Sequence, residues 1–329
     1  MKKYVLVTGG AGYIGSLTSS MLIDEGYEVV VLDNFSTGHE WLVDERAKLV
    51  EGDFGDQDLL ESLVNEFNFY GAMHFAGETI IPTSLSDPKK ILEHNVVKTL
   101  NFIDILAKNG INNFIISSSS AVYGNKEGKE IREDEDKIPG NVYGESKLIC
   151  EKILYWYTQS YPEFRSICFR YFNAAGAWDR YGEAHSCETH LIPNILRAAN
   201  DEIDFKIFGE NYPTRDGTCI RDYTHIYDIS QAHLLALNNI SKFKFEEFNL
   251  GYGIGYSVKE VLSACEKVTG RKINYISETE RPGDVAFMIA DGTKAREILG
   301  WKPKFHEIEG VIETAWKWFN ENRSKINYE

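Results

Sequence analysis

Short apolar segments alternate with amphipathic segments along the first half of the chain. We expect strands at the continuous apolar runs, which are residues 4–8, 28–32, 49–50, 72–75, 114–118 and 166–171. The intervening segments carry apolar side chains at helical spacing and predict helices, one ending at Gly26, one beginning at Asp56, and two over about 87–110 and 142–160. Apolar strands that alternate with helices are typical of a parallel sheet covered on both faces, so the pattern predicts a doubly wound α/β fold.

The alternation becomes irregular after Asn173. A loop rich in Gly, Ala and His follows at residues 176–189, and fragments of helix and strand come after it. Ser257 and Glu260 have the spacing of a capping box at the start of a helix. The periodicity of residues 307–322 predicts a final amphipathic helix.

The change in pattern predicts two domains. We expect the first at residues 1–173 and a smaller, mixed α/β domain at residues 174–329, with the chain returning to the first near 222–245. No linker rich in Pro, Gly or Ser separates them. The two domains are therefore expected to pack closely around a cleft.

Charge and composition exclude several classes of protein. The 329 residues carry a formal net charge of −15, from 50 acidic and 35 basic residues, which disfavours binding to nucleic acids and to anionic membranes. No segment approaches the ~18 apolar residues of a membrane-spanning helix, and the apolar stretch at the N-terminus is too short for a signal peptide. We expect a cytoplasmic globular protein whose five scattered cysteines stay reduced.

Three glycines lie between the first predicted strand and the first predicted helix. They are Gly9, Gly12 and Gly15, and they permit a tight turn, close approach of the backbone to a pyrophosphate, and contact between helix and strand. Asp33 ends the second strand, where its carboxylate can accept hydrogen bonds from an adenosine ribose. This order predicts a Rossmann site for NAD, since Asp33 would repel the 2′-phosphate of NADP. A glycine-rich turn without a ligand is the alternative.

Tyr143 and Lys147 are four residues apart, on one face of a predicted helix. A nearby ammonium and a cationic nicotinamide would both favour the ionised tyrosine hydroxyl, so Tyr143 is a candidate acid and base. Four serines, residues 117–120, end the fifth predicted strand, where ligands bind in sheets of this kind. One of these hydroxyls is expected to contact a reacting oxygen, and the others to satisfy backbone groups.

Arginines in the second half are candidates for contacts with a phosphate. Arg221 and Arg281 suit bidentate hydrogen bonds to phosphate oxygens, with Asp284 and Asn173 as polar neighbours. Each could instead form a surface ion pair, and their spacing alone leaves both interpretations open.

The eight histidines form no HxxxH or HExxH pattern. His185 and His190 flank Cys187, but their spacing is not that of a metal site. We interpret them as polar loop residues and expect no metal.

The motifs resemble those of the extended short-chain dehydrogenases and, more narrowly, of the UDP-glucose 4-epimerase family. The resembling segments of the first domain are VTGGAGYIGS at 7–16, VLDNFSTG at 31–38, EGDF at 51–54, HFAG at 74–77, FIISSSSAVYG at 114–124, YGESKL at 143–148 and RYFNAAGA at 170–177. Those of the second are ETHLIP at 188–193, IFGENYPTRDGTCIRDYTHIYDIS at 207–230, NLGYGIGYSV at 249–258 and ERPGDVAFMIAD at 280–291. The resemblance covers essentially the whole chain.

The resemblance implies a role for each matching position. Tyr143 would take the proton of the sugar 4-hydroxyl while hydride leaves C4 for NAD, Lys147 would activate Tyr143, and Ser119 would be the catalytic serine. With these three and the glycines, the implied cofactor residues are Tyr13, Ile14, Asp33, Asn34, Phe35, Ser36, Thr37, Gly38, Asp53, Phe54, Phe75, Ala76, Gly77, His94 and Phe172. With Ser119 and Tyr143, the implied residues for the nucleotide sugar are Asn173, His190, Leu191, Lys206, Ile207, Phe208, Arg221, Arg281, Asp284 and Met288.

The chain departs from the family pattern at four places. Residues 78–84 lack the family's Lys and its VGES segment, and His94-Asn95 replaces an Asn-Asn pair. His190-Leu191 replaces an Asn-Leu pair of the uridine pocket. Met288 occupies the sugar-gate position, where a bulky aromatic goes with plain hexoses and a small residue also admits N-acetyl groups. A flexible methionine leaves both outcomes open.

We therefore expect an isomerase of carbohydrate metabolism that interconverts UDP-glucose and UDP-galactose at C4 through a 4-keto intermediate. The alternatives are 4-epimerisation of UDP-N-acetylglucosamine or another UDP-sugar, a 4,6-dehydratase, and a non-catalytic NAD sensor. A homodimer is also expected from the helices at about 90–108 and 145–160. They carry more apolar residues than the single face that packs on the sheet requires, including Leu148, Ile149, Ile153, Leu154, Trp156 and Tyr157. Packing of these residues on the sheet alone is the alternative.

Overall fold

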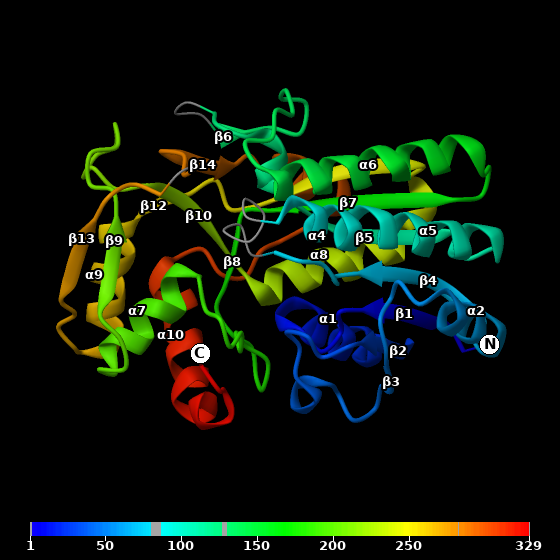
Figure 1. The fold of residues 1–329 in the computed structure, drawn as a ribbon, viewed down its shortest axis with the longest axis horizontal. Coiled ribbons are helices and arrows are strands. Elements are labelled where there is room, and N and C mark those ends of the chain that lie inside the picture. The colour runs from blue at the N-terminus through cyan, green and yellow to red at the C-terminus, as the bar shows by residue number, and fades with distance from the viewer. Residues whose placement is uncertain (1, 80–86, 127–129, 282, 329) are drawn as a thin grey trace.

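Figure 1 shows the computed structural model of the chain, which describes residues 2–79, 87–126, 130–281 and 283–328. A seven-stranded sheet, parallel throughout, forms one half of the molecule. Its order is β11 (Phe245–Leu250), β7 (Arg165–Tyr171), β5 (Asn113–Ser119), β4 (Phe69–His74), β1 (Tyr4–Thr8), β2 (Glu28–Asp33) and β3 (Lys48–Glu51). All six predicted strands are present, and the doubly wound fold is confirmed. The seventh strand, β11, was not predicted.

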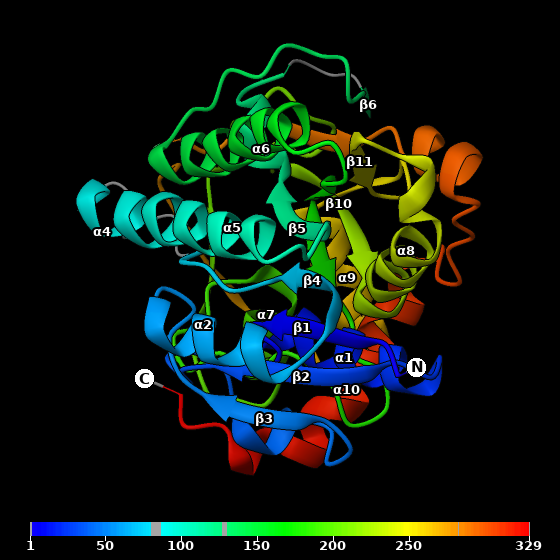
Figure 2. The same cartoon turned by 90° about the vertical axis from the view of Figure 1, so that its right-hand side faces the viewer.

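Helices cover both faces of this sheet (Figure 2). Val5 and Val7 point toward one face and Leu6 toward the other, as the period of two requires. The first face packs against α1 (Tyr13–Asp24) and α8 (Ile226–Asn239). The second packs against α2 (Gln57–Glu66), α5 (Thr99–Lys108) and α6 (Val142–Ser160). Because all seven strands are parallel, their carboxyl ends meet at one edge, where a ligand can bind between the helices.

The helix expected over about 87–110 consists of three parts. It begins as α4 (Pro88–Leu92), where the Asp87 side chain accepts a hydrogen bond of 3.0 Å from the Lys90 amide, and it ends as α5. Between them Glu93–Lys98 is π-helical, which the sequence pattern did not predict. The Cys150 thiol of α6 donates to the Asn95 carbonyl within this stretch, with Sγ 3.0 Å from the oxygen.

Two small sheets and three helices form the other half. The first sheet centres on β10 (Ile220–His225), which pairs with β8 (Asn173–Ala175), β12 (Gly255–Ser257) and β14 (Phe287–Ala290). The second pairs β9 (Phe205–Phe208) with β13 (Tyr275–Glu278). The helices are α7 (Leu191–Ala199), α9 (Val258–Thr269) and α10 (Ile308–Asn322), which share a core with β9 and β10. The capping box at Ser257 and the final amphipathic helix are confirmed.

The chain crosses between the two halves more than once (Figure 1). The strand β6 (Glu130–Ile131) leaves the first half to pair with β14 of the small sheet. In the other direction, α8 packs on α1 and β11 extends the large sheet beside β7. Among the described residues, no helix combines the length and apolar composition that crossing a membrane requires.

His233 of α8 is a buried polar group within the larger core. Its ring lies against Phe75 and Phe169, its Nδ1 is 2.9 Å from the Ile229 carbonyl oxygen, and its Nε2 is 2.7 Å from the Tyr171 hydroxyl. Burial lowers the pKa of His233 to about 4. The imidazole is therefore neutral in the folded protein at neutral pH.

This burial predicts a loss of stability in acid. Below about pH 6.5 the unfolded chain protonates this ring, whereas the folded chain does not until about pH 4, so stability falls as the pH decreases through that window. The shift corresponds to about 3 kcal/mol by pH 4. Urea unfolding at pH 7.5 and pH 4.5 should show a smaller difference for His233→Phe than for the parent protein. The control His306→Gln, at an exposed histidine, should keep the parent difference. An unchanged difference in His233→Phe would contradict the assignment.

Candidate functional site

A cavity of about 1030 Å³ begins at the carboxyl edge of the large sheet and extends to α7, β9 and α10. The glycine turn lines one end, Ser119, Tyr143 and Lys147 line the middle, and Arg221 and Arg281 line the other end. Thus segments that are far apart in sequence form one continuous wall.

The glycine turn brings two stretches of backbone unusually close together. Gly9 has φ +73°, and a Cβ there would lie 2.6 Å from the Ala76 amide nitrogen. A Cβ on Gly15 would lie 2.2 Å from the Gly9 carbonyl oxygen. In the part of the chain that the structure describes, no side chain caps α1 at Gly12, so the first amides of this helix remain available to a phosphate.

Asp33 ends β2 beside this turn. Its Oδ2 accepts a hydrogen bond from the Ala11 amide and its Oδ1 accepts one from the Phe35 amide, each at 2.9 Å. Burial raises the pKa of Asp33, although both amides act in the opposite direction. The two oxygens keep lone pairs free for further donors, as an adenosine ribose would supply.

Ser119, Tyr143 and Lys147 lie between the turn and the arginines. The N-terminus of α6 is fixed because Asn141 Oδ1 accepts from the Gly144 amide at 2.8 Å. The Lys147 ammonium is buried and donates to the Ser117 carbonyl at 2.9 Å, and its Nζ lies 5.9 Å from the centre of the Tyr143 ring. These contacts place the side chains of Tyr143 and Lys147 beside the carboxyl end of β5.

A buried ion pair beneath this group was missed by the sequence analysis. Arg170 of β7 donates to both carboxylate oxygens of Glu151, from Nε at 2.9 Å and from Nη2 at 2.7 Å. The Ser118 hydroxyl donates to the same carboxylate at 2.5 Å. Glu151 lies eight residues after Tyr143 on the buried side of α6, and this spacing is the signal that could have found it.

The departure after HFAG lies only partly within the described residues. Residues 80–84 fall outside them, whereas Glu78 and Thr79 line the cavity. The Asn95 side chain holds Glu78 by accepting from its amide at 2.8 Å and donating to its carbonyl at 3.0 Å. The Glu78 carboxylate forms an ion pair with Lys90 at 3.1 Å.

The arginines at the far end are held by stacking and by charge. The Arg281 guanidinium lies 3.7 Å from the centre of the Phe208 ring. Arg221 Nη2 lies 3.8 Å from a carboxylate oxygen of Asp284. Lys206 forms an ion pair with Glu278 at 3.0 Å, and Asn173 donates to the Asp222 carbonyl at 3.1 Å.

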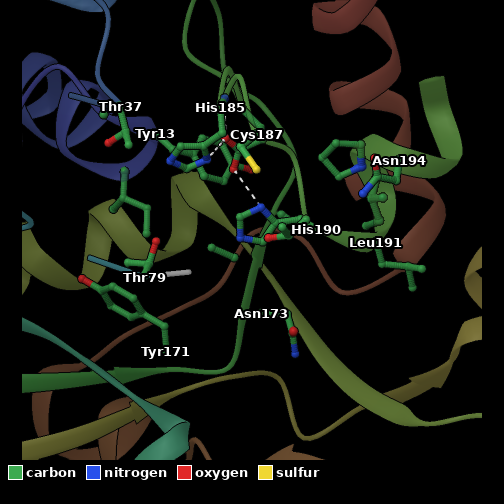
Figure 3. A pocket seen from close by; sticks show the side chains of 18 of the residues that line it. Tyr13, Thr37, Thr79, Tyr171, Asn173, His185, Cys187, His190, Leu191 and Asn194 are labelled. Atoms are coloured by element: carbon green, nitrogen blue, oxygen red, sulfur yellow. Dashed lines mark hydrogen bonds and ion pairs between the residues drawn. The ribbon is translucent and has the colours of Figure 1, made fainter. Parts of the chain in front are cut away.

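The segment before α7 brings Glu183, His185, Glu188 and His190 together, and all of these except Glu188 line the cavity. Figure 3 shows His185, Cys187 and His190 gathered on one side of the pocket near Tyr13. Glu183 raises the pKa of His185. Partial desolvation opposes the charging of the half-exposed His190 ring, but Glu188 and Glu183 outweigh it and raise the pKa of His190. The imidazoles likewise lower the pKa of Glu183 to about 2 although its burial acts in the opposite direction.

Most of the residues predicted for the site line this cavity. The predicted residues in its wall are Gly9, Gly12, Tyr13, Ile14, Gly15, Asp33, Asn34, Ser36, Thr37, Gly38, Phe54, Phe75, Ala76, Gly77, His94, Ser119, Tyr143, Lys147, Phe172, Asn173, His190, Leu191, Lys206, Ile207, Phe208, Arg221, Arg281 and Asp284. Their roles in binding or catalysis stay predictions.

Three predicted residues, Phe35, Asp53 and Met288, are not part of the lining. Phe35 has φ +55° and packs against the larger core. Asp53 accepts from Lys98 at 2.7 Å and from Asn34 at 3.2 Å, so it supports the loop that follows β2. Met288 is buried in a cluster that Phe172, a lining residue, also contacts.

Asp33 gives a test of the dinucleotide end. A charge-assisted hydrogen bond contributes about 1.5–3 kcal/mol, so Asp33→Ala is expected to weaken NAD binding by about tenfold or more. The variant should also discriminate less against NADP. Calorimetric titration of both dinucleotides measures this. The control Asp58→Ala, at an exposed residue of α2, should bind as the parent does, and equal NAD affinity in Asp33→Ala would refute the role of Asp33.

Comparison with known proteins agrees with this architecture. Residues 5–251 match the family model described as "NAD dependent epimerase/dehydratase family". The chain is 42% identical over 318 residues to a UDP-glucose 4-epimerase of Lacticaseibacillus casei, covering 95% of this chain and 96% of that one. It is similar to the UDP-glucose 4-epimerase of Brucella ovis solved in complex with NAD, with TM-score 0.92, 38% identity, and coverage of 96% and 98%.

The enzyme of Bifidobacterium longum, solved with NAD+ and UDP, matches with TM-score 0.92 and 34% identity, covering 98% of this chain and 99% of that one. These likenesses extend over both halves of the molecule, so they include the glycine turn, α6 and the arginine end. The chain belongs to the NAD-dependent epimerase/dehydratase family.

Proposed function

We propose that this chain is an NAD-dependent 4-epimerase that interconverts UDP-glucose and UDP-galactose. The observation that carries the proposal is the single cavity, in which Ser119, Tyr143 and Lys147 lie between a dinucleotide turn and a pair of arginines. The family and the relatives, which are named UDP-glucose 4-epimerase, support the same activity.

The residues of the turn fit NAD. Gly9 and Gly15 leave no space for a side chain against neighbouring backbone, which keeps the turn tight. The uncapped N-terminus of α1 at Gly12 leaves its first amides open to a pyrophosphate. Asp33 would hold the adenosine ribose through its free lone pairs. When bound, NAD supplies an acceptor and donor of hydride for C4 of the sugar.

The residues of α6 and β5 would handle the proton. The ionised Tyr143 oxygen would take the proton of the sugar 4-hydroxyl as hydride leaves C4, and the resulting hydroxyl would return it when hydride is added to the other face. One N–H of Lys147 is bound to the Ser117 carbonyl, which leaves the others for Tyr143 and for a ribose. The Ser119 oxygen accepts from the Ala121 amide at 3.2 Å, so its own proton is free for the sugar oxygen.

The arginine end would hold the UDP group. Arg221 and Arg281 supply positive charge in a protein of net charge −15, and Phe208 orients Arg281 by stacking. Tight binding of the diphosphate, remote from C4, would retain a keto sugar while the hexose turns over.

We propose that the two predicted domains bind different ligands. We assign cofactor binding to residues 1–173 and binding of the nucleotide sugar mainly to residues 174–329, with the chain returning to the first domain near 222–245. The packing of α8 on α1 and the pairing of β11 with β7 support this return. We further propose that the protein is cytoplasmic, since all five cysteines are unpaired in the part of the chain that the structure describes.

A homodimer is part of the proposal. The helices α4 to α6 lie on one side of the molecule (Figure 2) and expose Val97, Leu100 and Trp156, of which Trp156 is 65% exposed. Leu148 and Leu154, which the sequence analysis offered for the same surface, pack inward instead. An apolar surface of this kind suits contact with a second copy of the chain.

The activity is tested by direct observation of the product. Purified protein, first without and then with added NAD, is incubated with UDP-galactose or with UDP-N-acetylgalactosamine, and the anomeric signals are followed by NMR. We expect conversion of UDP-galactose. Tyr143→Phe should lose at least ~100-fold in rate, because the proton then has no acceptor. The control Tyr155→Phe, at an exposed tyrosine of the same helix, should keep the rate.

Each other outcome has a defined meaning. Conversion of the N-acetylated sugar as well would mean that the cavity admits an N-acetyl group although Met288 does not line it. A Tyr143→Phe variant that keeps the parent rate would remove Tyr143 from the proton transfer. No conversion of either sugar, with NAD present, would overturn the proposed activity.

The dimer is tested by sedimentation at micromolar concentration. The parent protein should sediment as a species of twice the chain mass, and Trp156→Glu should shift it toward the monomer because a charge in an apolar interface is unfavourable. The control Ile298→Glu, at an exposed apolar residue of another segment, should leave the mass unchanged. A monomeric parent protein would refute the dimer.

A further inference from the structure

Glu183, His185, Glu188 and His190 lie close together on the segment that leads into α7. One nitrogen or oxygen from each of the four side chains lies within 4.8 Å of the others. Glu183 and His185 line the cavity together with His190, which is the residue immediately before Leu191 of α7. The spacing of the histidines alone predicted polar loop residues, because the two glutamates between and beside them do not form an HxxxH or HExxH pattern.

The hydrogen bonds within the group leave one buried acceptor unused. Glu188 Oε1 accepts from the amide of His190 at 2.6 Å and lies 2.7 Å from its Nδ1. Glu183 Oε1 accepts from the His185 amide at 3.2 Å and also forms an ion pair with Nδ1 of His185. Glu183 Oε2 has no hydrogen-bond partner among the described residues, and Nδ1 of His190 lies 3.6 Å from it.

This unused oxygen belongs to a side chain that water barely reaches. The Glu183 side chain is 8% exposed, and the side chain of Glu188 is 1% exposed. A buried carboxylate oxygen without a donor is unfavourable. If the four side chains formed only ion pairs with one another, this oxygen would have a donor. Its lack of one leaves a position at the centre of the group for a cation.

We propose that Glu183, His185, Glu188 and His190 form a binding site for a divalent transition-metal cation of the Zn²⁺ class. Two imidazole nitrogens with two carboxylate oxygens are a donor set that Zn²⁺ accepts in tetrahedral geometry. Imidazole selects Zn²⁺, Co²⁺ and Ni²⁺ over Mg²⁺ and Ca²⁺, which prefer oxygen ligands alone. The site shares the cavity wall with Tyr143 and Lys147 and includes His190, which the resemblance assigns to the nucleotide sugar, but its test does not depend on the proposed activity.

A cation in this position would join the ends of a loop. Glu183 follows Gly182, which lies against Trp318 of α10, and Tyr181, which packs on α1 and α8. His190 is at the other end of the loop, immediately before α7. The bound cation would therefore fix the loop of residues 183–190 between these two supports. It would also hold the part of the cavity wall near Tyr13 in one conformation.

The experiment is a titration of the full-length protein after dialysis against a chelator. Calorimetry with Zn²⁺ should give one cation per chain with a dissociation constant on the order of micromolar or lower. Co²⁺ should produce visible absorption bands of tetrahedral nitrogen and oxygen ligation, and excess Mg²⁺ should not remove them. Stoichiometric Zn²⁺ should raise the melting temperature, because it binds the folded state.

Variants separate this site from general attraction of cations to an acidic surface. His190→Gln, at a half-exposed side chain, should lose at least tenfold in affinity together with the Co²⁺ bands. Glu188→Gln should do the same, and circular dichroism confirms that each variant is folded. The matched control His306→Gln should bind as the parent does. Binding that survives in His190→Gln and Glu188→Gln, binding without the Co²⁺ bands, or no stoichiometric binding would each overturn the proposal.

Discussion

The buried guanidinium of Arg170 is the centre of a hydrogen-bond network that connects the two halves of the molecule. It donates to Glu151 of α6 and to the Tyr123 hydroxyl, the latter at 2.7 Å from Nη1. Tyr123 donates in turn to Asn249 of β11 at 2.7 Å, and the Asn249 side chain donates to the Ile131 carbonyl of β6 at 2.8 Å. Removal of one member of such a buried pair costs about 3–5 kcal/mol, so these elements are expected to move as one body.

This network fixes the helix and strands that carry the candidate catalytic residues, although none of those residues is part of it. The helix that carries Tyr143 and Lys147 is tied through Glu151 to the strands that carry Ser118 and Arg170. Because β6 pairs with β14, the same network reaches the small sheet that bears Arg221 on its central strand. The distance between Tyr143, the proposed proton-transfer group, and Arg221, a proposed phosphate contact, therefore depends on this buried network. Preorganisation of this kind lets binding energy at one end be used at the other.

The sequence pattern predicted the strands, helix caps and turns that are determined by residues close together in the chain. The apolar runs located six strands, and Asp56, Asp87 and Ser257 marked helix starts because a cap depends on three or four neighbouring residues. The glycine turn could be recognised for the same reason. Most of the predicted site residues line one cavity because the strand ends of a parallel sheet converge.

Features that need distant partners could not be predicted in this way. The strand β11 has acidic residues, Glu246 and Glu247, and becomes a strand through its pairing with β7. The partnership of Arg170 with Glu151 requires the sheet to exist first. The same holds for Met288, whose position in a buried cluster depends on how β14 packs beside Phe172.

The number of residues in the π-helical stretch between α4 and α5 determines which way the neighbouring side chains point. A π turn contains one residue more than an α turn, so every side chain after it is rotated about the axis by roughly 100°. That rotation lets Lys98 reach Asp53 while Asn95 faces Glu78 and α6. The Asn95 carbonyl within this stretch accepts from the thiol of Cys150, which stays protonated because burial raises the pKa of Cys150 to about 12. Deletion of a single residue here would leave the composition almost unchanged and still turn one of these contacts away from the cavity.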